Sequence, residues 1–486
     1  MDRPRARRPR RPRGLRASLG PGAAGGRVPP GRRRSGPRQG PRGARAPAPR
    51  RALLVGRARP RADPRPRPRR ARAPRAATLG GDGVVSGLLR HREFLRRVPL
   101  EPRYDVVVIG GGVVGLSIAY NLAARHGIRR VAVLERAYLG AGASGRNTQV
   151  VRANYNTPET VPLYKASLEL WRTLGQELDF NIQFSTQGEL DLVHTRDALE
   201  VERDKALLDA AYGVPMEILT PDEVLERCPH VDLTGGGELP VLGASYHPPG
   251  SFARHDSVVW AYATAATRLG VHVHEGVEVT GLDVREGRCR GVMTTAGPVE
   301  AGAVVSAVAG WSSVVARMAG LRLPISTHPL QAFVTEPVRH VIDGLVSSMD
   351  LYVYVSQTAR GELLVGAEIL PYNTYSQRST FDFLAEAAKR TIMILPLAAK
   401  ARAMRQWAGL CDMTPDSSPI LGRTEVEGFF LAAGMGTWGF KGAPIFGRTM
   451  AELVATGRTP ELIAPFSPER FAADRMVPDA ASAGTH

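Results

Sequence analysis

The chain has 486 residues and a formal net charge of +18, but the charge is unevenly distributed. Residues 1–80 contain 26 arginines, no lysine and two acidic residues, a net charge of +24, so the remaining residues together carry −6. The basic character therefore does not mark the folded part as a nucleic-acid-binding protein.

The three cysteines are widely spaced and form no CxxC pair, so neither a disulfide framework nor a zinc site is indicated. No apolar run approaches the roughly 20 residues that a membrane span needs, and no secretory signal precedes the folded part. We therefore expect a cytoplasmic protein that does not contact a membrane.

Residues 1–90 are rich in Arg, Pro, Gly and Ala and almost lack aromatic side chains. Such a segment cannot bury enough apolar surface to fold and is predicted to be disordered. Three origins are open: a genuine basic tail, a targeting peptide, or translated upstream sequence. Many prolines and few serines disfavour a transit peptide. Because these four residue types have codons rich in G and C, we favour an overextended N-terminus with initiation between Val84 and Phe94.

The first predicted elements are a buried strand, a glycine turn and a helix in residues 104–123. Gly110 permits the tight turn, Gly112 lets the backbone approach a diphosphate, and Gly115 lets the helix pack closely on the strand. The next predicted strand ends at Glu135, whose carboxylate can accept a hydrogen bond from a ribose hydroxyl. With the diphosphate at the helix N-terminus, the pattern predicts a dinucleotide site. The alternative is a glycine turn in an ordinary βαβ unit.

Two further small-residue segments indicate a flavin rather than a nicotinamide. Residues 142–148 form a loop suited to backbone contact with a phosphate chain or a ring, with Arg146 as an anion partner. Residues 428–436 predict a strand that enters a glycine turn before a helix, which would direct N–H groups at an anionic ring edge. A βα loop without a ligand is the alternative. Between these segments, residues 301–312 predict a strand and turn that return the chain to the first sheet.

From about residue 90 onward, the chain resembles the beta subunits of heterotetrameric sarcosine oxidases, within the glycine oxidase and D-amino-acid oxidase family of flavoproteins. Beyond the glycine turn, the resemblance rests on short motifs in the expected order, at residues 146–148, 152–155, 184–188, 253–256, 328–331, 354–357 and 438–442. It implies an α/β fold of the D-amino-acid oxidase type, in which a Rossmann-like FAD-binding domain carries an inserted, mixed α+β substrate domain.

The FAD-binding domain is expected to be discontinuous, with the active site between the two layers. Its three pieces are residues 104–180, 250–325 and 405–465. The substrate domain comprises residues 181–249 and 326–404. Alternation of polar and apolar residues predicts half-buried antiparallel strands in the substrate domain, within residues 188–194 and 351–355.

The resemblance also implies the chemistry. FAD would be held noncovalently, and FMN would be attached to a histidine of this subunit. Sarcosine would transfer a hydride to FAD, and electrons would pass through FMN to oxygen, giving hydrogen peroxide, glycine and formaldehyde or methylene-tetrahydrofolate. Alpha, gamma and delta subunits are the implied partners. The expected cofactor contacts are Gly110, Gly112, Val113, Gly115, Glu135, Arg146, Thr148, Val150, His255, Val279, Gly310, Gly436, Gly439 and Lys441.

Arg152 and Lys441 match the positions that bind the substrate carboxylate in this family. A fixed cationic pair would orient an amino acid so that hydride transfer becomes effectively intramolecular. Lys441 could instead stabilise a reduced, anionic flavin, and Arg152 could be a cation on a solvated face.

His255 matches the histidine that carries FMN. The neighbouring Asp256 could orient its imidazole, or the two residues could simply start a helix over residues 257–269. Monomeric relatives attach FAD through a cysteine that would align with Gly409, so Cys411 is expected to be unmodified.

Two rival functions remain open. One is a single-flavin oxidase or dehydrogenase of another secondary amino acid, such as dimethylglycine, an opine or proline, which would need no FMN. The other is a flavin-bearing scaffold subunit whose catalysis depends on partners, or a degenerate member that only assembles. A purely structural descendant need not keep Arg152, Lys441 and the glycines.

Overall fold

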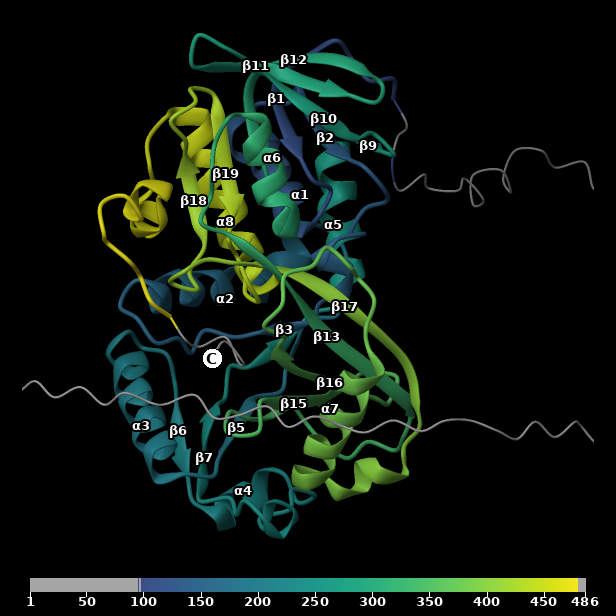
Figure 1. Ribbon diagram of the computed structural model, residues 1–486, viewed down its shortest axis with the longest axis vertical. Helices are drawn as coiled ribbons and strands as arrows, with labels where there is room; N and C mark the ends of the chain where they lie inside the picture. The colour runs from purple at the N-terminus through teal and green to yellow at the C-terminus, as the bar shows by residue number, and fades with distance from the viewer. Residues whose placement is uncertain (1–94, 96–97, 480–486) are drawn as a thin grey trace, which may run out of the picture. The chain divides into compact units, whose positions relative to one another are not determined.

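The computed structural model describes residue 95 and residues 98–479 (Figure 1). The predicted disorder of residues 1–90, and the initiation site predicted at residues 84–94, lie outside the described residues.

The first sheet is a Rossmann-like parallel layer, drawn in the upper half of Figure 1. From one edge to the other, its strands are β18 (Ile420–Arg423), β19 (Phe429–Ala433), β12 (Gly297–Ser306), β1 (Arg103–Ile109), β2 (Val131–Glu135) and β9 (His272–Glu275). All neighbours pair in parallel except β18, which is antiparallel to β19. Because the central strands are buried on both faces, they are runs of Val, Ile, Leu and Ala rather than alternating sequences.

Helices cover both faces of this sheet. On one face α1 (Val113–His126) packs against α5 (His255–Arg268) and α8 (Gly439–Thr456), and α2 (Thr160–Glu177) packs on α8. On the other face lie α6 (Ser312–Met318) and the strands β10 (Val279–Arg285) and β11 (Arg288–Thr294). These two strands pair antiparallel, and β11 also pairs antiparallel with the first residues of β12. None of the helices in the described residues combines the length and hydrophobicity that crossing a bilayer requires.

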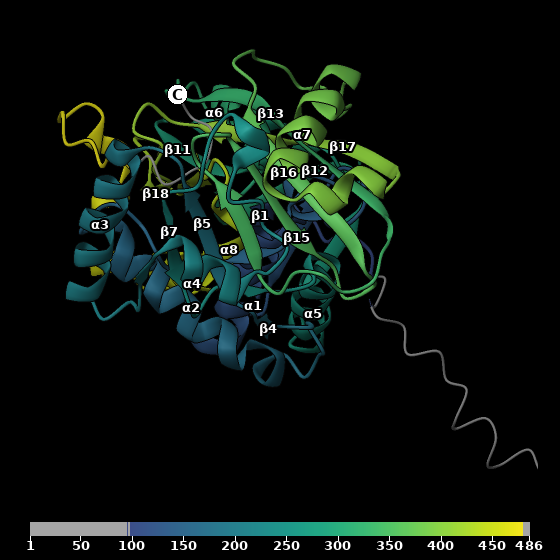
Figure 2. The same cartoon turned by 90° about the horizontal axis from the view of Figure 1, so that it is seen from below.

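The second sheet has eight strands and is mixed. In order they are β17 (Ala403–Met413), β13 (Ser326–Pro337), β16 (Glu362–Ile369), β15 (Val353–Gln357), β14 (Leu345–Ser348), β5 (Glu189–Val193), β7 (Gly243–His247) and β6 (Glu217–Leu219). Only β14 and β5 pair in parallel. Helices α4 (Pro221–Arg227) and α7 (Phe381–Ile394) pack on one apolar face, where α7 lies over β15 and β16 (Figure 2).

The polar residues of β5 and β7 face away from that apolar core, towards α3 (Arg196–Ala211). A small third sheet is formed by β3 (Val150–Val151), β8 (Ser251–Phe252) and β4 (Ser185–Thr186). In the sequence, these strands lie between strands of the two larger sheets.

Several predicted elements are confirmed. Residues 301–306 return to the first sheet beside β1, and residues 428–436 form β19 and a turn that leads into α8. Two details differ. Residues 405–413, placed by sequence with the FAD-binding pieces, pair along β13 in the second sheet. Helix α5 begins at His255 rather than Ser257. The domain division as a whole remains a prediction.

The antiparallel strand predicted within residues 188–194 is present as β5, which pairs with β7, but the prediction that it is half-buried is wrong. All five residues of β5 are buried, including Glu189 and Asp191. The polar face of the strand does not meet solvent, because α3 and an internal cavity cover it.

A buried ion pair fixes the C-terminal part of the fold. Arg470 and Asp416 are each 1% exposed as side chains, with Nε donating to Oδ2 at 2.7 Å and Nη2 donating to Oδ1 at 2.9 Å. Arg470 also donates to the carbonyl oxygens of Phe466 and Ser418. This bidentate pair therefore ties the chain after α8 to the turn that precedes β18.

Arg470→Ala is expected to lower the free energy of unfolding by about 3–5 kcal/mol, because it leaves the Asp416 carboxylate buried without its partner. Chemical denaturation measures this loss. The matched control is Arg458→Ala, which removes an exposed pair with Glu452 and should cost no more than about 1 kcal/mol. Equal losses in the two variants would contradict the role assigned to Arg470.

Candidate active site

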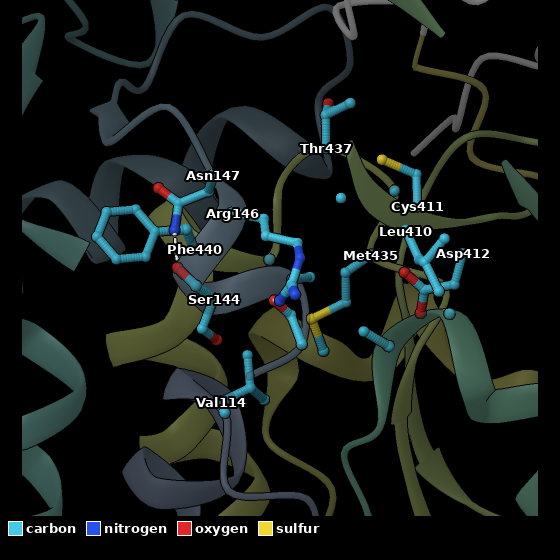
Figure 3. A pocket seen from close by; sticks show the side chains of 18 of the residues that line it. Val114, Ser144, Arg146, Asn147, Leu410, Cys411, Asp412, Met435, Thr437 and Phe440 are labelled. Atoms are coloured by element: carbon cyan, nitrogen blue, oxygen red, sulfur yellow. Dashed lines mark hydrogen bonds between the residues drawn. The ribbon is translucent and has the colours of Figure 1, made fainter. Parts of the chain in front are cut away.

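A cavity of about 550 Å³ is lined by residues of both large sheets (Figure 3). Its lining includes the glycine turn after β1, the segment 141–150, the turn before α8, and side chains from β5, β13, β14 and β15. The site therefore lies where the Rossmann-like layer meets the second sheet, the kind of interface where ligand pockets form.

The glycine turn brings three backbone segments into contact. Gly110 has φ +109°, and a Cβ there would lie 2.4 Å from the Ala307 carbonyl oxygen. A Cβ on Gly115 would lie 2.1 Å from the carbonyl oxygen of Gly110. Both contacts need glycine, and together they hold the N-terminus of α1 against the end of β1. That N-terminus borders the cavity, as a diphosphate site requires; Gly112 provides no side-chain cap, and Val113 N donates to Ser144 Oγ at 2.9 Å.

Glu135 is held in place at the end of β2. Its Oε2 accepts a hydrogen bond from Gly111 N at 2.9 Å, and its Oε1 accepts from Ala137 N at 2.8 Å. The carboxylate lines the cavity, so it lies where a bound dinucleotide could use it as an acceptor. The turn, the helix start and this acid fit FAD.

A second part of the cavity lies between the segment 143–147 and the ends of β17 and β19. Figure 3 shows Ser144 and Asn147 on one side, Leu410, Cys411 and Asp412 on the other, and Arg146 and Met435 between them. The Arg146 guanidinium donates to carbonyl oxygens of its own loop, at Ala141 and Gly142, and Trp407 Nε1 donates to the Arg146 carbonyl oxygen at 2.8 Å.

Asp412 fixes the turn before α8. Its Oδ2 accepts from Gly434 N at 2.6 Å. Burial raises the pKa of Asp412 to about 6, against the opposing effect of backbone hydrogen bonds. Burial also raises the pKa of the neighbouring Cys411 thiol, which disfavours the thiolate.

The most polar part of the lining is a group of ionisable residues, the charged cluster, consisting of Arg152, Glu189, Asp191, Glu202, Lys205 and Lys441. The residue just after β3, Arg152, is 9% exposed. It donates to the Asn154 carbonyl oxygen at 2.8 Å, and its Nε lies 3.6 Å from Glu189 Oε1. Burial by itself would lower its pKa, but attraction to several anionic groups, Glu189 foremost, together raises the pKa above the usual value.

Lys441 lies in the first turn of α8 and is 9% exposed. Its carbonyl oxygen accepts from Ser167 Oγ at 2.6 Å and from Trp171 Nε1 at 2.8 Å, which fixes this turn against α2. Burial, and then the positive charge of Arg152, lower the pKa of Lys441 to about 7. A buried cation beside a second cation is a natural site for an anion.

The structure brings most of the predicted site residues together. The cavity is lined by Gly110, Gly112, Val113, Glu135, Arg146, Thr148, Val150, Arg152, Val279, Gly310, Gly436, Gly439 and Lys441. Two predicted residues do not line it. Gly115 lies behind Gly110, where it allows the helix to pack on the strand. His255 lies at the start of α5.

His255 has a separate environment. Among the described residues, its buried Nδ1 has no hydrogen-bond partner. Burial lowers the pKa of His255 to about 4, against the opposing effect of Asp256. Asp256 itself pairs with Arg254 at 2.7 Å rather than with the imidazole. The ring is therefore neutral near pH 7.

Sequence reasoning missed four members of the charged cluster: Glu189, Asp191, Glu202 and Lys205. The first two alternate with leucines in β5, a pattern that is the same for a strand facing solvent and for a strand facing a polar cavity. One signal was available. Two carboxylates in a strand next to a motif of the resemblance, residues 184–188, could have indicated an internal polar face.

Comparison with known proteins places the fold and site in a class. The model of the family described as FAD dependent oxidoreductase matches residues 105–453. The chain belongs to this family and is an FAD-dependent oxidoreductase.

Two relatives show which proteins of this family the chain resembles. Sarcosine oxidase subunit beta of Arthrobacter sp is 42% identical over 392 residues, covering 80% of this chain and 96% of the relative. Sarcosine oxidase subunit beta of Rhizobium meliloti is 40% identical over 397 residues, covering 80% and 94%. The resemblance to sarcosine oxidase beta subunits is confirmed.

Solved structures agree on the fold. The L-proline dehydrogenase of P. horikoshii superposes with a TM-score of 0.73 at 31% identity, covering 78% of this chain and 100% of the other. Glycine oxidase from Geobacillus kaustophilus gives 0.70 at 28% identity, covering 76% and 99%. The predicted α/β fold of the D-amino-acid oxidase type is confirmed.

Gly110→Ala is expected to abolish most FAD binding, because a side chain at φ +109° would meet the Ala307 carbonyl oxygen. The ratio of flavin to protein absorbance after purification measures the effect. Gly127→Ala is the matched control, since Gly127 also has positive φ but a Cβ there meets nothing within 4 Å. The control should lose about 1 kcal/mol of stability and keep its flavin. Full flavin content in Gly110→Ala would contradict this reading of the turn.

Proposed function

We propose that the protein is the catalytic beta-type subunit of a sarcosine oxidase, which removes the methyl group of sarcosine by hydride transfer to FAD. The observation that carries this proposal is that two buried basic residues, Arg152 and Lys441, line the same cavity as the glycine turn. The names of the Arthrobacter and Rhizobium relatives support the choice of substrate.

Arg152 and Lys441 would bind the substrate carboxylate. A buried, low-dielectric setting strengthens such an ion pair, and two fixed donors set the orientation of a small amino acid. Bound FAD would supply the hydride acceptor. The protein's own contribution is to anchor the carboxylate, orient the N-methyl carbon and exclude bulk water.

A second flavin, FMN, is proposed at His255, with electrons passing through it to oxygen to give hydrogen peroxide. The other products would be glycine and formaldehyde or methylene-tetrahydrofolate. A neutral imidazole with a buried, unpartnered Nδ1 among the described residues supports this role, because bonding to a flavin carbon needs an unprotonated nitrogen. Alpha, gamma and delta subunits would complete the enzyme.

The test is to purify the protein with the chains that co-elute, precipitate it in acid, and examine its tryptic peptides. A yellow peptide containing His255, together with FAD in the supernatant, is the expected result, and His255→Asn should remove the covalent flavin but keep FAD. His272→Asn, at a histidine of β9, is the control. A colourless pellet would instead favour a single-flavin enzyme acting on another secondary amino acid, a reading supported by the likeness to L-proline dehydrogenase.

The role of Lys441 predicts a pH dependence of ligand binding. The pKa of Lys441 is lowered to about 7, so above that pH the ammonium loses its proton, and affinity for a carboxylate should fall by about tenfold per pH unit. Methoxyacetate is a suitable probe because its carboxylate stays ionised above about pH 5. Its dissociation constant can be followed through the flavin absorbance.

In Lys441→Met, methoxyacetate should bind at least about tenfold more weakly at pH 6, and its affinity should no longer change between pH 6 and 9. Lys165→Met, which removes a lysine that donates to the Tyr212 carbonyl oxygen outside the cavity, should behave like the wild type. A pH dependence that persists in Lys441→Met would assign the titration to another group.

A further inference from the structure

The carboxylates of the charged cluster differ in how completely they are paired. Asp191 accepts from Ser347 Oγ through one oxygen and lies 3.9 Å from Lys205 Nζ through the other. Glu202 accepts from Ser245 Oγ at 2.5 Å and pairs with Lys205 Nζ at 3.2 Å. Both carboxylates are therefore committed to partners on neighbouring elements.

Glu189 is different. Its side chain is 5% exposed and lines the cavity, and its Oε1 lies 3.6 Å from Arg152 Nε. Its Oε2 is buried and has no hydrogen-bond partner among the described residues. A carboxylate oxygen that is removed from water and left unpaired costs free energy, so it is rarely kept without a function.

The position of Glu189 relative to the cations defines what could satisfy it. In an amino acid, one carbon separates the amine from the carboxylate, so an acceptor for the amine must adjoin the cations that bind the carboxylate. Glu189 meets this requirement, because it contacts Arg152 directly and acts electrostatically on Lys441. The cluster thus offers a cationic side and an anionic side to one small ligand.

We propose that Glu189 is a specificity-determining residue whose Oε2 binds the ammonium group of the substrate. The inference rests on the proposed function and narrows its substrate class to zwitterionic amino acids, in preference to carboxylic acids without an amine. Arg152 and Lys441 hold the carboxylate of the ligand, and Glu189 fixes the direction in which its nitrogen points.

The experiment compares two ligands of nearly equal shape in the FAD-loaded protein. Sarcosine carries an ammonium group, whereas methoxyacetate has an ether oxygen in its place. The dissociation constant of methoxyacetate comes from flavin absorbance changes, and that of sarcosine comes from the concentration dependence of anaerobic flavin reduction or from competition against methoxyacetate. The wild type should bind sarcosine at least about tenfold more tightly than methoxyacetate.

In Glu189→Gln, sarcosine binding should weaken by roughly 10–100-fold, because a charge-assisted hydrogen bond is lost, while methoxyacetate binding should change by less than about threefold. Asp350→Asn is the control: it neutralises a carboxylate outside the cavity lining, whose oxygens accept from His194 N and Thr195 Oγ1. In that variant, the ratio of the two dissociation constants should stay within about threefold of the wild-type ratio.

Equal weakening of both ligands in Glu189→Gln would overturn the proposal, since it would mean that Glu189 only orients Arg152. If that variant does not fold, the wild type still decides: methoxyacetate binding as tightly as sarcosine overturns the proposal. Failure of sarcosine to reduce the flavin would refute the proposed function alone, because competition against methoxyacetate still reports whether the ammonium group is recognised.

Discussion

The site depends on one close backbone approach. The carbonyl oxygen of Gly110 lies against Gly115, and that of Ala307 lies against Gly110, so the end of β1, the start of α1 and the turn after β12 meet without intervening side chains. This contact holds the N-terminus of α1, where Val113 N donates to Ser144 Oγ at 2.9 Å, at the border of the cavity. The rest of the lining comes from other elements, including strands β5, β14 and β15 of the second sheet.

Another part of the lining consists of buried charged side chains, whose burial costs free energy unless the charges are paired. Lys205 meets that requirement, since attraction to Glu202 and Asp191 outweighs burial and raises its pKa. For Lys441, burial and the charge of Arg152 outweigh the attractions of Glu189 and Asp191, and its pKa is lowered to about 7. In this cluster, Lys205 is paired with carboxylates of the protein. Lys441 and Glu189 are less completely paired, so they remain able to bind a ligand. That asymmetry is what a binding site for a small dipolar ligand needs.

The parts of the fold that depend on local rules could be predicted from the sequence. The Val and Ile strand before Gly110, the acid at Glu135 and the glycine turn before α8 each have a backbone reason to occur where they do. The anionic side of the cluster could not be predicted, because Glu189 and Asp191 obey the period of any two-sided strand. Whether that face meets water or a cavity depends on how α3 packs against it, which the alternation within β5 does not reveal.

The environment of His255 bears on how two flavins could share one chain. The residue starts α5, which packs on α1, yet it does not line the cavity that the N-terminus of α1 borders. His255 would therefore hold a second flavin from outside the lining of the FAD cavity. The neighbouring Asp256 side chain is 52% exposed, so the start of α5 reaches the protein surface. Another subunit could then cover it, which connects the proposed second cofactor to the proposed assembly.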